Sequence, residues 1–417
     1  MYFALKDRFE ITKDLVEKKS NFDLFLKDTG RQLLYNTLYR GFYQGKYHCG
    51  QLYSTGENGE FMNINVNEFR NNILHIKSLI LSQKITLTPA AANTNVDALS
   101  QSLLGKDVLS YYSRKLKMDL LMDKSLDTGI LYADCYALTQ WDASLGRAII
   151  ENEFGRKIYE GDPTIQIFPP HMVSIDPVNP DSDWHIFQFK VNKYNLAVEF
   201  PDLADEIVRE QLDIKYDFDA QMSTTLTNYS KDAIYVYKFF HKDTPLVPGG
   251  REVLYIHDKL TLSDTPLQTP FYPVDKFQTA EVEDSPFGYS ATFDSIQLCN
   301  ANNKVFSTMI TNESKFGVQL VLCPKGADFE VTDVVDGAKF LEYDPSAGIP
   351  TALNLLATSE KTFNLSGLIS TKNDLTMGVN EVTKGQNPEG VESGNALALL
   401  QSMTVQFNST TQKNFVI

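Results

Sequence analysis

The sequence contains little cysteine and no long apolar run. Its four cysteines, Cys49, Cys135, Cys299 and Cys323, lie far apart and form no CxxC pair. This spacing argues against a zinc knuckle and a disulfide scaffold, and predicts reduced, mostly buried thiols in a cytoplasmic setting. No run of about 18 apolar residues is present, so we expect no membrane-spanning helix. The first residues lack a basic segment followed by an apolar one, so no cleaved secretory signal is expected.

The motifs of common enzyme classes are also absent. The sequence has no GxxxxGKS/T phosphate loop, no GxGxxG after a strand, no GxSxG elbow and no HExxH pair. The acidic turn Asp181-Ser182-Asp183 lacks the glycine and the final glutamate of a calcium loop. Cys299 has no histidine nearby in the sequence and is a weak candidate for a nucleophile. We therefore predict that the chain is not an enzyme and has no catalytic residue, cofactor or metal site.

The histidines do not have the spacing of metal ligands, which favours structural roles for them. They are His48, His75, His171, His185, His241 and His257.

Composition predicts a globular protein of two or three domains. The chain has 417 residues, of which 42% are hydrophobic and 22% charged. Its net charge of −15 counts against tight binding of nucleic acid, which requires an excess of lysine and arginine. An acidic protein can still surround DNA without holding it, although solubility alone explains such a charge.

Hydrophobic spacing predicts helices in the first third and strands in the middle of the chain. We expect helices over residues 1–55 and 67–84, and over 96–138 with interruptions at Gly105 and Gly129. An acidic amphipathic helix is expected over residues 201–212. Strands are predicted at 164–168, 173–175, 184–191, 234–240 and 252–256.

The last third is predicted to return to helix. Asp284-Ser285-Pro286 is a typical helix start, and this helix is expected to run to about Ser314. Its middle is unusually polar and predicts a surface that faces solvent or lines a wet space; the residues are Gln297, Asn300, Asn302, Asn303 and Lys304. We then expect strands at 319–323 and 339–343, a helix over 359–377, a loop over 378–394 and a helix from 395. Together these elements predict an α+β fold.

Three stretches of the second half resemble the portal proteins of tailed bacteriophages, particularly the podovirus-type and crAss-like ones. Ser285-Pro286-Phe287-Gly288 before a long polar helix is similar to the portal helix entry, although no glycine stands two residues before Ser285. Leu341-Glu342-Tyr343-Asp344-Pro345 is similar to the strand and turn before the next portal helix. Met377-Gly378-Val379-Asn380, followed by Ser393-Gly394-Asn395-Ala396-Leu397, resembles the helix–loop–helix near the portal channel. The first half fits more loosely, through Asn63-Ile64-Asn65, Trp141-Asp142 and Ile175-Asp176-Pro177.

The resemblance implies a portal fold with a helical wing, a β-rich middle region, a long stem helix and C-terminal helices. The corresponding regions are a helical wing at 1–165, a β-rich wing or clip region at 166–283 and a stem-type helix at 284–316. A wing return with the channel loop follows at 317–394, and the C-terminal helix begins at 395–417. Because that helix is still running at Ile417, we expect a C-terminal portion such as the crown to be missing.

The resemblance also implies a function. Portal subunits form a dodecameric homo-oligomeric ring at one capsid vertex, through which double-stranded DNA is packaged and ejected. The implied partners are the terminase, the major capsid protein, a head–tail adaptor and DNA bound without sequence specificity. The implied locations are the virion and, during assembly, the host cytoplasm, with no membrane association. Candidate residues near the DNA are Asn380, Lys384, Gly385, Gln386 and Asn387, and Gln297, Asn300, Asn303 and Lys304 form the candidate polar face of the stem helix.

Two alternatives remain open from the sequence. The first is another virion component, such as a head–tail connector, for which the long helices count against a strand-rich tail protein. The second is an α+β metal-dependent hydrolase or nucleotidyltransferase, whose site would be assembled only in three dimensions. A pocket with convergent carboxylates would favour the enzyme, whereas ring formation would favour the portal. A ligand-binding module has no supporting sequence feature.

Overall fold

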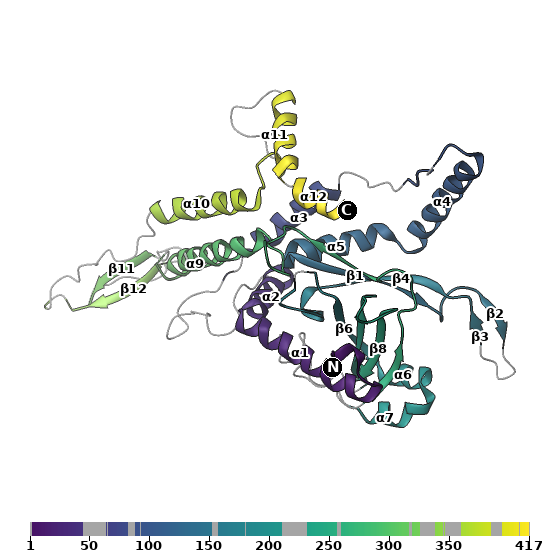
Figure 1. Cartoon of the computed structure of the whole chain (residues 1–417). Helices are drawn as coiled ribbons and strands as arrows, with labels where there is room; N and C mark the ends of the chain where they lie inside the picture. Colours follow the sequence, from purple (N-terminus) through teal and green to yellow (C-terminus); the bar gives the residue numbers. More distant parts are fainter. Residues whose placement is uncertain are drawn as a thin grey trace.

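The chain folds into a body with two extensions. The computed structural model describes residues 2–44, 64, 66–81, 88–91, 93–151, 157–179, 181–210, 232–256, 260–316, 319–325, 338–344, 346, 360–384, 394–407 and 409–416. Helices and mostly antiparallel strands share these residues, which confirms the α+β class. In Figure 1 a rod projects from one side of the body, and helix α4 (Val96–Lys115) projects from the other.

Helices dominate the first part of the chain, as predicted. After a short 3-10 turn at Phe3–Leu5 come α1 (Arg8–Asp28), α2 (Arg31–Tyr39), a π-helical turn (Arg40–Gln44) and α3 (Glu68–Leu81). Gly30 separates α1 from α2 with a φ of 70°, a left-handed conformation that glycine adopts at little cost. Helix α3 buries Phe69, Ile73 and Ile80, three of the residues predicted for its apolar face.

The prediction of one helical stretch over 96–138 is wrong in two respects. The break between α4 and α5 (Met118–Tyr132) lies at Lys117, which has a φ of 53°, while Gly105 lies inside α4. Gly129 does not interrupt α5 either. A glycine is needed at this position because a Cβ would clash with the Phe277 ring. Helix α5 ends at Ala133 in a left-handed conformation, and residues 134–138 belong to a strand.

A five-stranded antiparallel sheet forms the middle of the body, in the order β5-β6-β7-β8-β9. Its strands are β5 (Val173–Ile175), β6 (Trp184–Asn192), β7 (Ala233–His241), β8 (Arg251–Ile256) and β9 (Leu260–Thr265). Four of them confirm the strands predicted at 173–175, 184–191, 234–240 and 252–256, whereas β9 was not predicted. The helix predicted at 201–212 is shorter, with a 3-10 turn (Pro201–Leu203) and α7 (Ala204–Arg209) after the unpredicted α6 (Lys193–Glu199).

A second sheet joins strands that are far apart in the sequence, in the antiparallel order β10-β1-β4. These are β10 (Val274–Gln278), β1 (Asp134–Asp142) and β4 (Asp162–Phe168). Only β4 was predicted. A hairpin of β2 (Ala148–Glu151) and β3 (Lys157–Tyr159) extends from the end of β1. The boundary expected at residue 165 lies inside β4.

The rod consists of α9 (Thr292–Phe316) and α10 (Glu360–Met377), with β11 (Gln319–Pro324) and β12 (Ala338–Tyr343) at its far end. The two strands pair in parallel, and β11, β12 and α10 lie close to their predicted places. The predicted helix start at Ser285 is wrong, because the chain stays irregular until Thr292. The 25 residues of α9 span about 38 Å at 1.5 Å per residue. Helices α11 (Gly394–Phe407) and α12 (Ser409–Val416) follow, and α12 packs against β10.

The largest hydrophobic core lies where the N-terminal helices meet both sheets. It contains Phe22 of α1, Tyr35 of α2, Phe69 of α3, Leu126 of α5 and Tyr136 of β1, all at most 2% exposed. The same core includes residues of β5, β6 and α9. This shared core fixes the base of the rod to the body.

Candidate functional site

The polar middle of α9 does not form one wet surface. Gln297 and Lys304 are exposed and Asn300 is half-buried, whereas Asn302 and Asn303 are buried. The Asn303 carboxamide oxygen accepts a hydrogen bond from the backbone N–H of Val66 at 2.9 Å. The predicted wet face is therefore wrong for Asn302 and Asn303, whose partners come from distant parts of the chain.

Buried polar side chains join α9 to α10. The Asn302 side chain donates to the Ser370 hydroxyl at 3.1 Å and accepts from the Ser366 hydroxyl at 2.9 Å. Two turns nearer the body, the Ser295 hydroxyl donates to the Asn373 carboxamide oxygen at 2.6 Å. Because buried polar groups must find partners, these bonds fix how the two helices are rotated against each other.

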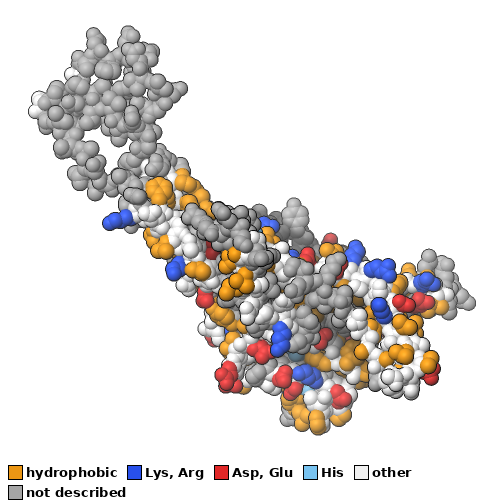
Figure 2. All heavy atoms as spheres, turned by 90° about the horizontal axis from the view of Figure 1, so that it is seen from above, with side chains coloured by type: hydrophobic (Ala, Val, Ile, Leu, Met, Phe, Trp, Pro, Cys, Tyr) orange, Lys and Arg blue, Asp and Glu red, His pale blue; other side chains and the backbone are white. Residues whose placement is uncertain are grey.

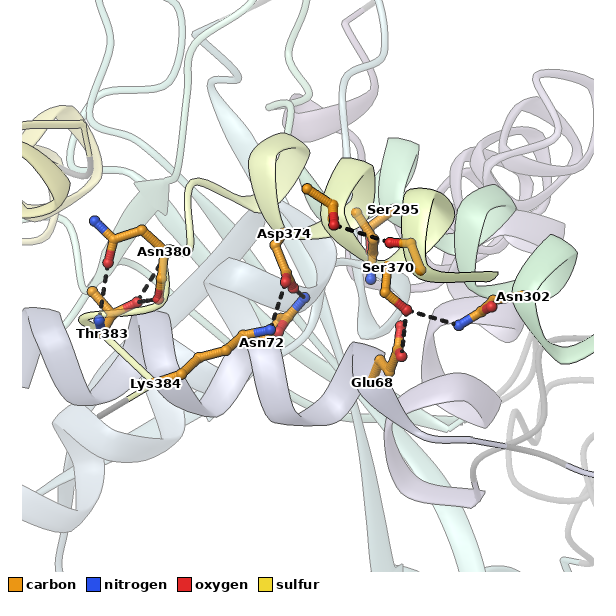
Figure 3. A network of polar contacts seen from close by, with 12 residues as sticks. Glu68, Asn72, Ser295, Asn302, Ser370, Asp374, Asn380, Thr383 and Lys384 are labelled. Atoms are coloured by element: carbon orange, nitrogen blue, oxygen red, sulfur yellow. Dashed lines mark hydrogen bonds and ion pairs between the residues drawn. The ribbon is translucent and has the colours of Figure 1, made fainter. Parts of the chain in front are cut away.

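The same polar junction continues from α10 to α3, as Figure 3 shows. Ser370 donates to the Glu68 carboxylate at 2.7 Å, and Asn72 donates to Asp374 at 3.0 Å. Lys384 lies 2.6 Å from the other carboxylate oxygen of Asp374. Asp374 therefore ties α3 and α10 to the turn that follows α10.

That turn is built by the predicted Met377-Gly378-Val379-Asn380 motif. Gly378 ends α10 with a φ of 66°, as expected for a helix C-terminus. The Asn380 side chain accepts from the backbone N–H of Thr383 at 2.9 Å and donates to the carbonyl of Leu400 in α11 at 3.4 Å. Asn380 thus holds the turn in shape and connects it to α11.

The structure brings together only part of the predicted DNA-proximal set. Asn380 and Lys384 lie in this turn, and the hydrogen bonds and ion pair described above already engage their side chains. Gly385, Gln386 and Asn387 lie outside the described residues. The polar junction thereby fixes the position of the turn up to Lys384.

A second buried polar cluster, which the sequence did not reveal, surrounds Asp134 at the start of β1. Its carboxylate accepts from the Gln278 side chain at 2.8 Å and from the backbone N–H of Gly288 at 3.0 Å. Burial raises the pKa of Asp134, and the hydrogen bond from Gln278 opposes this shift. Beside it, Lys276 donates to the Pro286 carbonyl at 2.5 Å, and burial lowers the pKa of Lys276.

This cluster explains the Ser285-Pro286-Phe287-Gly288 motif. Phe287 stacks on Phe25 at a centroid distance of 5.9 Å, and the Arg31 guanidinium lies 4.3 Å from the Phe287 ring centre. A Cβ on Gly288 would lie only 3.0 Å from the carbonyl oxygens of Ala133 and Ala280. The motif therefore anchors the base of the rod to the N-terminal helices and is not a helix start.

The two cysteines whose side chains are described are buried. Cys135 and Cys299 are buried free thiols, as predicted, and burial raises the pKa of Cys299 to about 11. A thiol with this pKa is protonated near neutral pH, so Cys299 does not fit a thiolate nucleophile. Cys49 and Cys323 lie outside the residues whose side chains are described.

Two of the histidines confirm the predicted structural role. His185 makes a 2.7 Å hydrogen bond with the Tyr272 hydroxyl, and burial lowers the pKa of His185 to about 3. His241 contacts the Tyr2 hydroxyl at 2.9 Å. The histidines at 48 and 257 lie outside the described residues.

The described ranges contain no cluster of three or more His, Cys, Asp or Glu side chains that could hold a metal ion. Among their helices, none is long and apolar enough to cross a bilayer.

In comparisons with known proteins, no family model matches the sequence, and no curated protein is significantly similar to it.

Proposed function

We propose that this chain is a portal subunit of a tailed bacteriophage. Copies of it form a dodecameric ring at one capsid vertex, through which double-stranded DNA is packaged and ejected. The ring works with a terminase, the major capsid protein and a head–tail adaptor. Its role is structural, and it carries no catalytic site of its own.

The observation that carries this proposal is the polarity of the rod. The contact between α9 and α10 is lined by asparagine and serine, while large apolar side chains of α10 point away from α9 and are exposed. These are Leu365, Leu368 and Leu375. Figure 2 shows hydrophobic side chains along the rod between the body and its tip.

Such a surface requires a partner. Exposed apolar side chains that lie together mark contact sites, and burial of each leucine or phenylalanine contributes about 1.5–3 kcal/mol. Rods placed side by side around an axis would cover this face, because a repeated heterologous contact closes into a ring. Rods that meet around this axis would line the channel.

The polar residues have distinct roles in this proposal. Gln297 and Lys304 remain exposed on α9 and are available to the channel. Lys384 is held by Asp374, so we assign it to positioning of the following segment and not to contact with DNA. The net charge of −15 disfavours tight phosphate contacts and allows DNA to slide.

Negative-stain electron microscopy of the purified chain tests the proposal. Class averages should show rings with near-twelvefold symmetry and a central hole wide enough for duplex DNA. A chain that remains monomeric at every protein concentration, with or without DNA, would contradict it.

A further inference from the structure

Helix α4 has a surface that the chain itself does not cover. A helix with apolar residues on several sides is normally buried, yet no residue of α4 is buried. Leu103 and Leu104 are each 65% exposed, and consecutive residues point about 100° apart around a helix. The exposed apolar side chains of α4 include Val96, Leu99, Leu103, Leu104, Val108 and Tyr111.

Contacts at its C-terminal end hold α4 away from the body. The Lys115 ammonium lies 2.5 Å from the Asp162 carboxylate on β4 and 5.5 Å from the Tyr111 ring centre. Lys117 then turns the chain into α5 through a left-handed conformation. Figure 1 shows α4 standing apart from both sheets.

The outer face of the three-stranded sheet is also incompletely covered. Tyr136 and Leu138 of β1 face the core, whereas Cys135, Ala137 and Thr139 face the opposite side, as strand alternation requires. An antiparallel sheet that is open to water usually carries polar residues on that side. Here the opposite side is largely apolar, which predicts a cover.

A groove of about 670 Å³ marks the uncovered part of this face. It lies between α5, the sheet and α12, and its apolar lining includes Met118, Met122, Ile165, Phe277 and Phe415. Most of these side chains are only half-buried. Asp275 and Glu281 are exposed and add negative charge to the lining.

We propose that α4 of one copy lies in this groove of a second copy. The helix supplies exposed leucines and carries a small excess of positive charge, with Lys106, Arg114 and Lys115 against Asp97 and Asp107. The groove lining carries a small excess of negative charge, with Asp275 and Glu281 against Lys276. Every subunit carries one helix and one groove on different surfaces, so the contact is heterologous and repeats around a ring. This contact rests on the proposed ring function and adds a second interface outside the rod.

The occupant is a second copy because α4 is directed away from the groove of its own chain. To enter that groove it would have to break the Lys115–Asp162 ion pair and reverse the turn at Lys117.

Disulfide cross-linking distinguishes docking into a second copy from docking within one chain. A Leu104→Cys chain is mixed with a Thr139→Cys chain, and the product is compared with the Leu104→Cys/Thr139→Cys double variant under oxidation.

The expected result is a two-chain product in the mixture and a ladder of larger products from the double variant. A matched control, Val198→Cys mixed with Thr139→Cys, should give no such product, because Val198 is exposed on α6 and outside the groove lining. An internal disulfide within single chains, or a Leu104→Cys product that links position 104 of both chains, would overturn the proposal. The unmodified chain gives the baseline from its native cysteines.

A second pair of variants separates this contact from the ring itself. Leu103→Glu/Leu104→Glu should weaken self-association at least about tenfold, because two apolar side chains lose their burial. Gln101→Glu/Ser113→Glu, two exposed positions on the other side of the same helix, should leave it unchanged. Rings that form normally from the leucine variant would overturn this inference and leave the portal proposal intact. A wild-type chain that neither associates nor cross-links would overturn both.

Discussion

The body and the rod distribute polarity in opposite ways. In the body, Tyr35, Leu126 and Tyr136 are buried and fill the core between the helices and the sheets. In the rod, Asn302 and Ser366 lie between the two helices, while Leu368 is 56% exposed on the outer side. Burial of apolar surface therefore stabilises the body within one chain, whereas the apolar surface of the rod gains stability only when another molecule covers it.

The body should be the part most sensitive to loss of a single polar group. Asp134→Ala leaves the Gly288 N–H and the Gln278 side chain without their acceptor in a buried site. We expect a loss of about 3 kcal/mol in the free energy of unfolding, measured by chemical denaturation. Asp134→Asn keeps one acceptor oxygen and should lose clearly less. An alanine variant as stable as the wild type would contradict the role of this anchor.

The body should also lose stability in mild acid. His185 has a pKa of about 3 in the fold against 6.5 when unfolded, so the unfolded chain binds more protons between these values. Stability is therefore lost as the pH falls below about 6.5, by about 2 kcal/mol at pH 5 for this one histidine. Buried His171 shifts in the same direction. His185→Asn should reduce the slope of unfolding free energy between about pH 7 and pH 5, and an unchanged slope would refute this explanation.

The rod should respond more weakly within an isolated chain. Asn302→Ala removes hydrogen bonds to Ser366 and Ser370, and we expect a loss of about 1–2 kcal/mol in the free energy of unfolding. Asn364→Ala on the exposed side of α10 is the matched control and should have little effect. Equal effects of the two variants would show that the polar junction does not orient the helices.

The smallest effect is expected at the end of α10. Lys384 and Asp374 are each 27% exposed, and ion pairs of this kind contribute about 0.5–1 kcal/mol. Lys384→Met should lower the free energy of unfolding by this amount at low salt and by less at high salt. The exposed Lys372→Met variant serves as control. A loss much larger than about 1 kcal/mol would mean that Asp374 depends on Lys384 for its position.

Local patterns predicted the elements of both regions better than their boundaries. Strand β7 and helix α10 were predicted within about one residue, because alternation in β7 and helical spacing in α10 are continuous. The first half of β1, residues 134–138, was predicted as helix because it carries apolar residues on both faces, which removes the alternation that identifies a half-buried strand. The turn at Lys117 had no signal, since a lysine with positive φ is set by tertiary packing.

The site was less predictable than the fold. The sequence singled out Asn303, Asn380 and Lys384 as polar residues in the right elements, but their partners, Val66, Leu400 and Asp374, depend on tertiary contacts. The motif Ser285-Pro286-Phe287-Gly288 was found for its helix-start residues, although its function is to fit against Asp134 and Phe25. Neither contact follows from spacing along the chain.

The central claim is that the outer face of α10 is a contact between copies in a ring. Negative-stain electron microscopy should compare the wild type with Leu368→Ser/Leu375→Ser and with the control Asn364→Ser/Thr371→Ser, all four positions being exposed. We predict rings from the wild type and the control, and isolated but folded subunits from the apolar variant. Rings of normal number and size from Leu368→Ser/Leu375→Ser would contradict the claim.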